Sequence, residues 1–140
     1  MERQPLTRRL PKNYALVRDI VLAAGRGAHQ SANDIYRKAR EAQPSIGFAT
    51  VHRGLGRLCE LGDVMKIQLS GGDSAWYEPP ARAHAHLHCD RCGQIVDVDY
   101  ATAPRTLRSI AEREGVRIEA ESLTFRGLCR TCARRRRKTP

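Results

Sequence analysis

Two pairs of cysteines constrain the fold of this chain more than any other feature. Cys89 and Cys92 form one C-x-x-C motif, and Cys129 and Cys132 form a second. Residues 93–128 separate the two motifs. In a C-x-x-C pair both thiolates can reach one ion, and two pairs complete the tetrahedral sulfur set that structural Zn²⁺ prefers. The intervening segment must then fold back so that the pairs meet. The spacing predicts a structural zinc site that joins both ends of a small domain.

Two independent redox pairs are the alternative, but no thioredoxin-like pattern surrounds either pair. The fifth cysteine, Cys59, lies near the apolar face of an expected helix and is interpreted as a buried side chain. The first residues lack the apolar stretch of a secretory signal, and no apolar run approaches the roughly 18 residues of a membrane span. We therefore expect a cytoplasmic protein with no membrane partner, where cysteines are more often metal ligands than disulfides.

Residues 1–80 predict three helices followed by a β-hairpin. The helical periodicity and stop signals place these elements at residues 13–24, 31–43 and 49–61, with strands at 64–69 and 74–78 around a Gly-Gly turn. Ser31 is the expected N-cap of the second helix, with Asp34 three residues later. Three helices and a hairpin in this order are the winged form of the helix-turn-helix module.

The third expected helix has two distinct faces. Val51, Leu55 and Leu58 form its core face, as Leu16, Ile20, Ala23 and Ala24 do on the first helix. Gly54 and Gly56 each cost about 1 kcal/mol relative to alanine, which the close approach of another surface would explain. The candidates for contact with bases or phosphates avoid the core face: Thr50, His52, Arg53 and Arg57. A merely solvated charged face is the alternative.

Beyond residue 80 a linker precedes a small βαβ-like unit. Strands are expected at residues 95–98, 116–118 and 123–125, with a helix at 107–114. A unit of about 55 residues buries little surface, so it needs a stabilising cross-link, such as a bound metal, or an oligomeric partner. The whole chain is therefore assigned to the α+β class.

The charge of the chain points to a polyanionic partner. The formal net charge is +10, which favours nucleic acid and also fits an acidic membrane surface. Aromatic residues are only 5% of the chain, which disfavours recognition of single strands through stacked bases. The basic run at residues 134–138 is interpreted either as a source of nonspecific phosphate attraction or as a solubilising tail.

A histidine-rich stretch precedes the first cysteine pair. If it is extended, His84 and His86 share one face and can bind one ion, with His88 as a spare donor. The further candidates are His29, Glu78, Asp97 and Asp99. Composition does not choose His29 over His88, nor Asp97 over Asp99, and a solvated linker is the alternative.

Three motifs together resemble the ferric uptake regulator family. Residues 45–53 resemble its recognition-helix signature, His84-x-His86-x-x-Cys89-x-x-Cys92 its hinge and first zinc knuckle, and Gly127-x-Cys129-x-x-Cys132 its second knuckle. The resemblance runs in order from about residue 13 to residue 132, nearly the whole chain.

The resemblance implies a homodimer that binds a palindromic operator in double-stranded DNA. It implies a winged-helix domain at residues 1–80, a hinge with metal ligands at 81–86, an α/β dimerisation domain at 87–133 and a basic tail at 134–140. It also places a regulatory metal, Fe²⁺ or Mn²⁺ with Zn²⁺ possible, between the domains. The implied ligands are His29, Glu78, His84, His86 and Asp97.

The resemblance predicts a metal-responsive repressor rather than an enzyme, and leaves its signal open. Asp97 matches the peroxide-sensing branch and Glu78 points the other way, whereas the lack of a cysteine near Glu78 disfavours a zinc-uptake regulator. His52 replaces the usual tyrosine of the recognition helix, which bears on base specificity. A zinc-stapled metalloenzyme and a plain zinc-ribbon interaction module are the competing classes. No general base or nucleophile accompanies the metal candidates.

Overall fold

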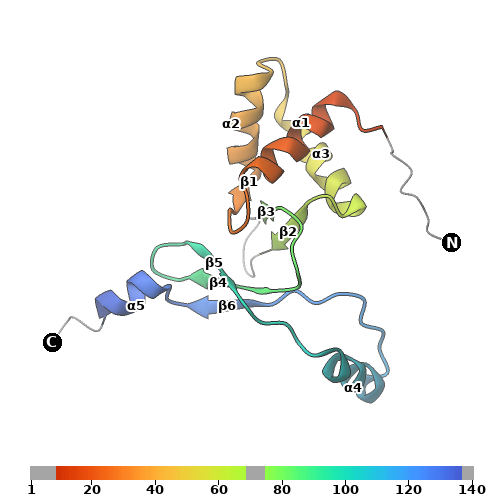
Figure 1. Ribbon diagram of the computed structural model, residues 1–140, viewed down its shortest axis with the longest axis vertical. Helices are drawn as coiled ribbons and strands as arrows, with labels where there is room; N and C mark the ends of the chain where they lie inside the picture. Colours follow the sequence, from red (N-terminus) through yellow and green to blue (C-terminus); the bar gives the residue numbers. More distant parts are fainter. Residues whose placement is uncertain (1–8, 69–74, 137–140) are drawn as a thin grey trace. The chain divides into compact units, whose positions relative to one another are not determined.

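The computed structural model describes residues 9–68 and 75–136, which form two compact units (Figure 1). Unit 1 comprises residues up to 80 and unit 2 comprises residues 81–136. The predicted Gly-Gly turn lies outside the described residues. Within those residues, no helix combines the length and the apolar composition needed to cross a membrane.

Unit 1 is a winged helix-turn-helix, as the sequence predicts. Its elements are α1 (Lys12–Ala23), β1 (Gln30–Ser31), α2 (Ala32–Ala42), α3 (Phe48–Leu61), β2 (Met65–Gln68) and β3 (Ala75–Glu78). The strands form an antiparallel sheet in the order β1-β3-β2. This arrangement confirms the three helices and the hairpin within one or two residues at most ends.

Local signals fix the start of α2. The Ser31 hydroxyl oxygen accepts a hydrogen bond from the Asp34 amide at 3.1 Å, and the Asp34 carboxylate accepts one from the Ser31 amide at 3.1 Å. This capping box satisfies two amides that the helix leaves without partners. The hydrogen bond from the Ser31 backbone also lowers the pKa of Asp34, so the carboxylate stays charged beside the positive end of the helix.

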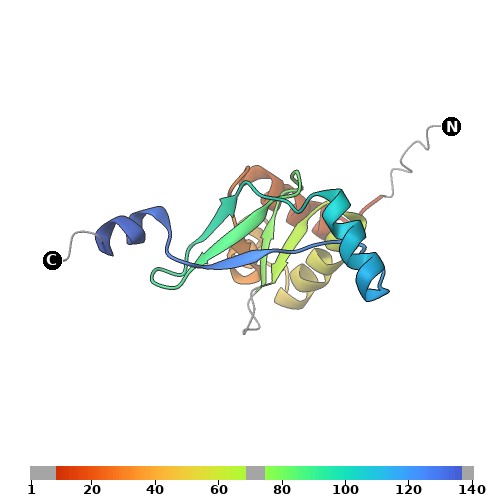
Figure 2. The ribbon, with the colours of Figure 1, turned by 90° about the horizontal axis from the view of Figure 1, so that it is seen from below.

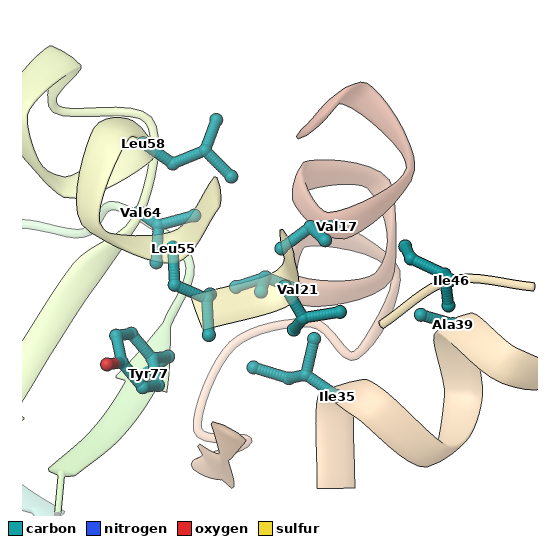
Figure 3. Packing of buried hydrophobic residues seen from close by; sticks show 10 residues of the cluster. Val17, Val21, Ile35, Ala39, Ile46, Leu55, Leu58, Val64 and Tyr77 are labelled. Carbon is teal, nitrogen blue, oxygen red and sulfur yellow. The ribbon is translucent and has the colours of Figure 1, made fainter. Parts of the chain in front are cut away.

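The core of unit 1 lies between the three helices and β3 (Figure 3). Val51, Leu55 and Leu58 of α3 are fully buried, as predicted. The prediction for α1 was wrong by about one position around the helix: Val17 and Val21 are fully buried, whereas Leu16 and Ile20 pack at the edge of the core and Ala23 is exposed. Because α1 packs on both α2 and α3, its buried stripe follows two partners rather than its own apolar pattern.

Unit 2 consists of a three-stranded sheet and two helices. Its elements are β4 (Ala85–Cys89), β5 (Ile95–Val98), α4 (Pro104–Glu114), β6 (Thr124–Gly127) and α5 (Arg130–Arg136). The strand order is β5-β4-β6, with β4 antiparallel to β5 and parallel to β6. Both views place α4 and α5 at opposite ends of β6 (Figure 2). The two units together confirm the α+β assignment.

Unit 2 differs from the sequence prediction in three places. The expected hinge overlaps β4, which is the central strand and therefore gains hydrogen bonds on both sides. Residues 116–118 form no strand, because α4 continues to Glu114 and the chain then runs to β6 without a pairing partner. The expected basic tail begins inside α5, which continues the second cysteine pair as helix to Arg136.

The two glycines of α3 predict opposite effects of alanine. A Cβ on Gly54 would lie 2.9 Å from Cδ1 of Tyr14 in α1, whereas nothing lies within 4 Å of a Cβ on Gly56. We expect Gly54→Ala to destabilise the protein by about 1–3 kcal/mol through overpacking. The control, Gly56→Ala, should stabilise it by roughly 0.5–1 kcal/mol because alanine is the better helix former. Urea unfolding measures both; equal effects would contradict this account of the α1–α3 contact.

Candidate metal centres and nucleic-acid interface

Strand register brings the two cysteine pairs together. Cys89 ends β4 opposite Gly127 at the end of β6, and Cys129 follows two residues later. The turn that carries Cys92 closes through a hydrogen bond from the Gly93 amide to the Cys89 carbonyl, and Gly93 has a φ of 74° that few other residues adopt. The Asp90 amide donates to the Gly127 carbonyl at 2.8 Å and ties this turn to β6.

The sulfur atoms of Cys89, Cys92, Cys129 and Cys132 all lie within 4.8 Å of one another, and all four residues are free thiols. The Sγ atoms of Cys92 and Cys129 are 3.8 Å apart. Four sulfurs held tetrahedrally at a Zn–S distance of about 2.3 Å are separated by roughly 3.8 Å, whereas a disulfide needs about 2.05 Å. The spacing and the donor chemistry therefore fit zinc.

The electrostatics of the four thiols also favour a bound cation. Backbone amides, first that of Cys129 and then that of Cys92, lower the pKa of the Cys89 thiol to about 6. A hydrogen bond with the Cys129 side chain, followed by burial, raises the pKa of Cys132 to about 12. The Cys89 thiolate thus forms readily, whereas the neighbouring thiols oppose the ionisation of Cys132. A divalent ion removes this opposition because it binds the thiolate form.

A second set of candidate ligands begins in unit 1. Gln30 of β1 lies opposite Tyr77 of β3, and the same antiparallel register places His29 opposite Glu78. The Nε2 atom of His29 lies 3.2 Å from Oε2 of Glu78. Ligand atoms bound to one ion at about 2.0–2.2 Å are roughly 2.8–3.6 Å apart, so this pair can occupy neighbouring coordination positions.

Unit 2 carries its own group of candidate ligands. His86 of β4 lies opposite Asp97 of β5, and His84 precedes His86 by two residues on the same face. The Nε2 atoms of both histidines lie 3.5 Å from Oδ1 of Asp97, within the same range of ligand spacing. The two imidazole rings are in contact, with centroids 4.6 Å apart.

A hydrogen bond orients the ring of His84. Its Nδ1 lies 2.6 Å from the carbonyl oxygen of Arg82. Because a carbonyl only accepts, Nδ1 carries the proton and donates, which leaves the lone pair on Nε2, the atom that faces Asp97. Histidines that bind metals commonly hold their second nitrogen in this way.

The register of β4 against β5 distinguishes the positions of candidate ligands that composition left open. Asp97 lies opposite His86, whereas Asp99 falls beyond the last residue of β5. His88 lies opposite Ile95, which offers no ligand atom. Sequence reasoning did not foresee the ion pair between Arg126 and Asp90 at 3.1 Å beside the cysteines, because only the β4–β6 pairing brings these residues together.

The candidates for DNA contact lie along α3. His52 and Arg53 are exposed, and Thr50 and Arg57 are half-buried. Arg53 donates to the Thr50 hydroxyl at 3.3 Å, and Arg57 pairs with Glu60 at 2.9 Å. Exposed pairs of this kind contribute little stability, so both guanidinium groups can exchange these partners for phosphates or base edges. Cys59, on the same helix, is half-buried rather than buried.

The chain resembles known proteins over most of its length. The model of the ferric uptake regulator family matches residues 17–126. The ferric uptake regulation protein of Bacillus subtilis is 36% identical over 126 residues, covering 87% of this chain and 83% of that protein.

Two solved structures share the fold. The ferric uptake regulator of Francisella tularensis with iron has a TM-score of 0.71 at 22% identity, covering 94% of this chain and 99% of that one. A zinc uptake regulator complexed with zinc and DNA has a TM-score of 0.70 at 24% identity, covering 92% and 86%. At these sequence identities, the similarity to the two structures shows only that the fold is shared.

The four thiols predict that zinc holds unit 2 together. Cys132→Ser should remove the bound zinc and lower the melting temperature, because the remaining sulfurs no longer complete a tetrahedral set. Cys59→Ala, which changes the thiol outside the cluster, should retain one zinc per chain. Elemental analysis of the purified proteins with thermal denaturation measures both. Full zinc content in the Cys132→Ser variant would contradict the assignment.

Proposed function

Because this chain belongs to the ferric uptake regulator family, we propose that it is a transcriptional repressor that binds DNA when a divalent metal joins its two units. In this proposal the regulatory ion is held by His29, Glu78, His84, His86 and Asp97, and the four cysteines hold a separate structural zinc. Fe²⁺ or Mn²⁺ is the proposed regulatory metal.

The observation that carries the proposal is that each unit carries an incomplete ligand set. His29 and Glu78 supply two ligand atoms in unit 1, and His84, His86 and Asp97 supply three in unit 2. Only residues 79–83 separate Glu78 from His84. Six residue steps span at most roughly 20 Å, so the connection keeps the two sets within reach of each other.

The chemistry of the combined set supports a divalent first-row metal. Three imidazole nitrogens and two carboxylates suit iron, manganese and zinc, and the two carboxylates neutralise the charge of the ion. The relatives include regulators whose structures contain iron, manganese or zinc. Zinc regulation is therefore the alternative within the family. Zn²⁺ binds most such sites more tightly than Fe²⁺ or Mn²⁺ does. The metal that is available in the cell therefore decides which ion occupies the site.

Metal binding controls DNA binding in this proposal through the orientation of the units. An ion that binds ligands from both units stabilises the orientations in which the two sets meet. When a dimer adopts such an orientation, two copies of α3 enter successive major grooves of a palindromic operator. Thr50, His52, Arg53 and Arg57 are the proposed contacts on each copy.

The surface of unit 2 supports the proposed homodimer. None of the residues of α4 is buried, although Leu107 and Ile110 recur on one face of this helix. Three large apolar side chains of the unit are also exposed: Tyr100, Val116 and Phe125. The proposed second copy covers this apolar surface and supplies burial that a unit of this size lacks.

Operator binding tests the regulatory proposal. The zinc-stapled protein is titrated onto a palindromic A/T-rich duplex without oxygen, with and without added Mn²⁺ or Fe²⁺. We expect tight binding only with metal. His86→Ala should abolish this dependence because it removes a proposed ligand, whereas His88→Ala on the same face of β4 should retain it. Wild-type binding that ignores every added metal would leave a constitutive DNA-binding protein and overturn the proposal.

Peroxide distinguishes the two proposed signals. Iron-catalysed oxidation of His29 or His84 should release DNA from the Fe²⁺ form and leave the Mn²⁺ form bound. Mass spectrometry should then show oxygen insertion at one of these histidines. Peroxide resistance of the Fe²⁺ form, with neither histidine modified, would identify a metal sensor instead of a peroxide sensor.

The apolar face of α4 predicts a matched pair of variants for the dimer. Ile110→Glu should produce monomers, because a buried carboxylate without a partner opposes association. Ser109→Glu adds the same charge at an exposed position about 100° around α4 from Ile110 and should leave the dimer intact. Sedimentation velocity measures both. A dimeric Ile110→Glu protein would place the interface elsewhere.

A further inference from the structure

The end of unit 2 that carries the four cysteines also carries a group of arginines that the regulatory proposal does not use. We name the group the zinc-end arginines: Arg91, Arg130, Arg134 and Arg135. Arg91 and Arg130 each lie between the two cysteines of a pair, so the convergence of the thiols brings them to the same end of the unit. Arg134 follows Arg130 by one turn on the same face of α5.

In the part of the chain that the structure describes, the zinc-end arginines are exposed and lack acidic partners. All four side chains are exposed, and no described carboxylate forms an ion pair with any of them. The nearby Asp90 is already engaged by Arg126 at 3.1 Å. The sequence contains no Asp or Glu after Glu121, whereas α5 itself has the sequence RTCARRR.

The charge of the zinc centre does not account for all of these arginines. Four thiolates and one Zn²⁺ leave two negative charges. Arg91 and Arg130, which are adjacent in sequence to the ligands, offset these two charges. Arg134 and Arg135 then remain as surplus positive charge at the surface of α5. A surplus that is not balanced within the fold is available to an external anion.

The chemistry of the group favours backbone phosphates as that anion. Guanidinium groups match phosphate oxygens through paired hydrogen bonds. α5 has no aromatic side chain on which an unpaired base could stack, and Ala133 and Cys132 are its only apolar residues, too few to enter a lipid surface. We propose that the zinc-end arginines form a second contact surface for duplex DNA, separate from α3, that binds phosphates without reading sequence.

This inference rests on the proposed function for its partner, since the proposed repressor binds duplex DNA. The proposed surface contributes to DNA affinity whether or not the regulatory metal is bound. Each phosphate contact releases counterions, so the surface should steepen the salt dependence of DNA affinity by about 0.9 in log–log slope per contact.

The test compares two double variants that remove the same formal charge. R134Q/R135Q removes the surplus arginines. R113Q/R117Q removes two arginines of unit 2 that already face carboxylates, Glu114 at 2.8 Å and Glu119 at 3.3 Å. Affinity for a non-operator duplex is measured by fluorescence anisotropy with the full zinc-loaded protein, without added Mn²⁺ or Fe²⁺, between about 50 and 200 mM salt.

We expect the slope for R134Q/R135Q to be shallower than wild type by about 1.8 per bound protomer, and the slope for R113Q/R117Q to match wild type. R134K/R135K should behave as wild type, which separates loss of charge from damage to α5. An unchanged slope in R134Q/R135Q, or equal changes in both glutamine variants, would overturn the proposal. Loss of binding to phosphatidylglycerol vesicles with an unchanged DNA slope would also overturn it and assign the surface to a membrane.

The two proposals fail in different ways. Metal-independent operator binding by the wild type would overturn the regulatory switch and leave the slope comparison intact. Equal slopes on the non-operator duplex would overturn the second DNA surface and leave metal-dependent operator binding intact.

Discussion

The convergence of four thiols is the interaction on which unit 2 depends. Its sheet has three short strands, α4 has no buried residue, and the small core contains Cys89, Cys129 and Cys132 themselves. The hydrophobic contribution of such a unit is small for its length. Zinc bound at this point would join the turn after β4 to the start of α5, and so hold the β4–β6 pairing. β4 also carries His86 and pairs with β5, which carries Asp97. The structural zinc and the proposed regulatory metal would thereby be linked through one strand.

Much of this arrangement could be predicted from the sequence, because the features are local. The capping box at Ser31, the end of α3 at Gly62 and the two C-x-x-C pairs each depend on residues close together in the chain. The choice of Asp97 over Asp99 was not local, since it follows from the register of β4 against β5. The buried stripe of α1 was misassigned for the same reason: two packing partners, including the close contact of Tyr14 with Gly54, determine which side faces inward.

The proposed regulatory site divides its ligands between the two compact units of the chain. Each set is positioned by its own sheet, β1 with β3 in unit 1 and β4 with β5 in unit 2. Neither set offers more than three ligand atoms, so the ion gains its full coordination only when the units come together. This division couples metal occupancy to domain orientation without requiring any change inside either unit.

Measurement of Mn²⁺ affinity with and without the operator duplex tests whether one ion couples the two units to DNA. Linkage requires that the operator tighten Mn²⁺ binding by the same factor by which Mn²⁺ tightens operator binding, and such couplings are typically about 5- to 150-fold. If one ion couples the two units to DNA, the two factors should be equal and lie in this range. The same Mn²⁺ affinity in the presence and absence of operator would contradict this coupling, because the ion would then be indifferent to the conformation that binds DNA.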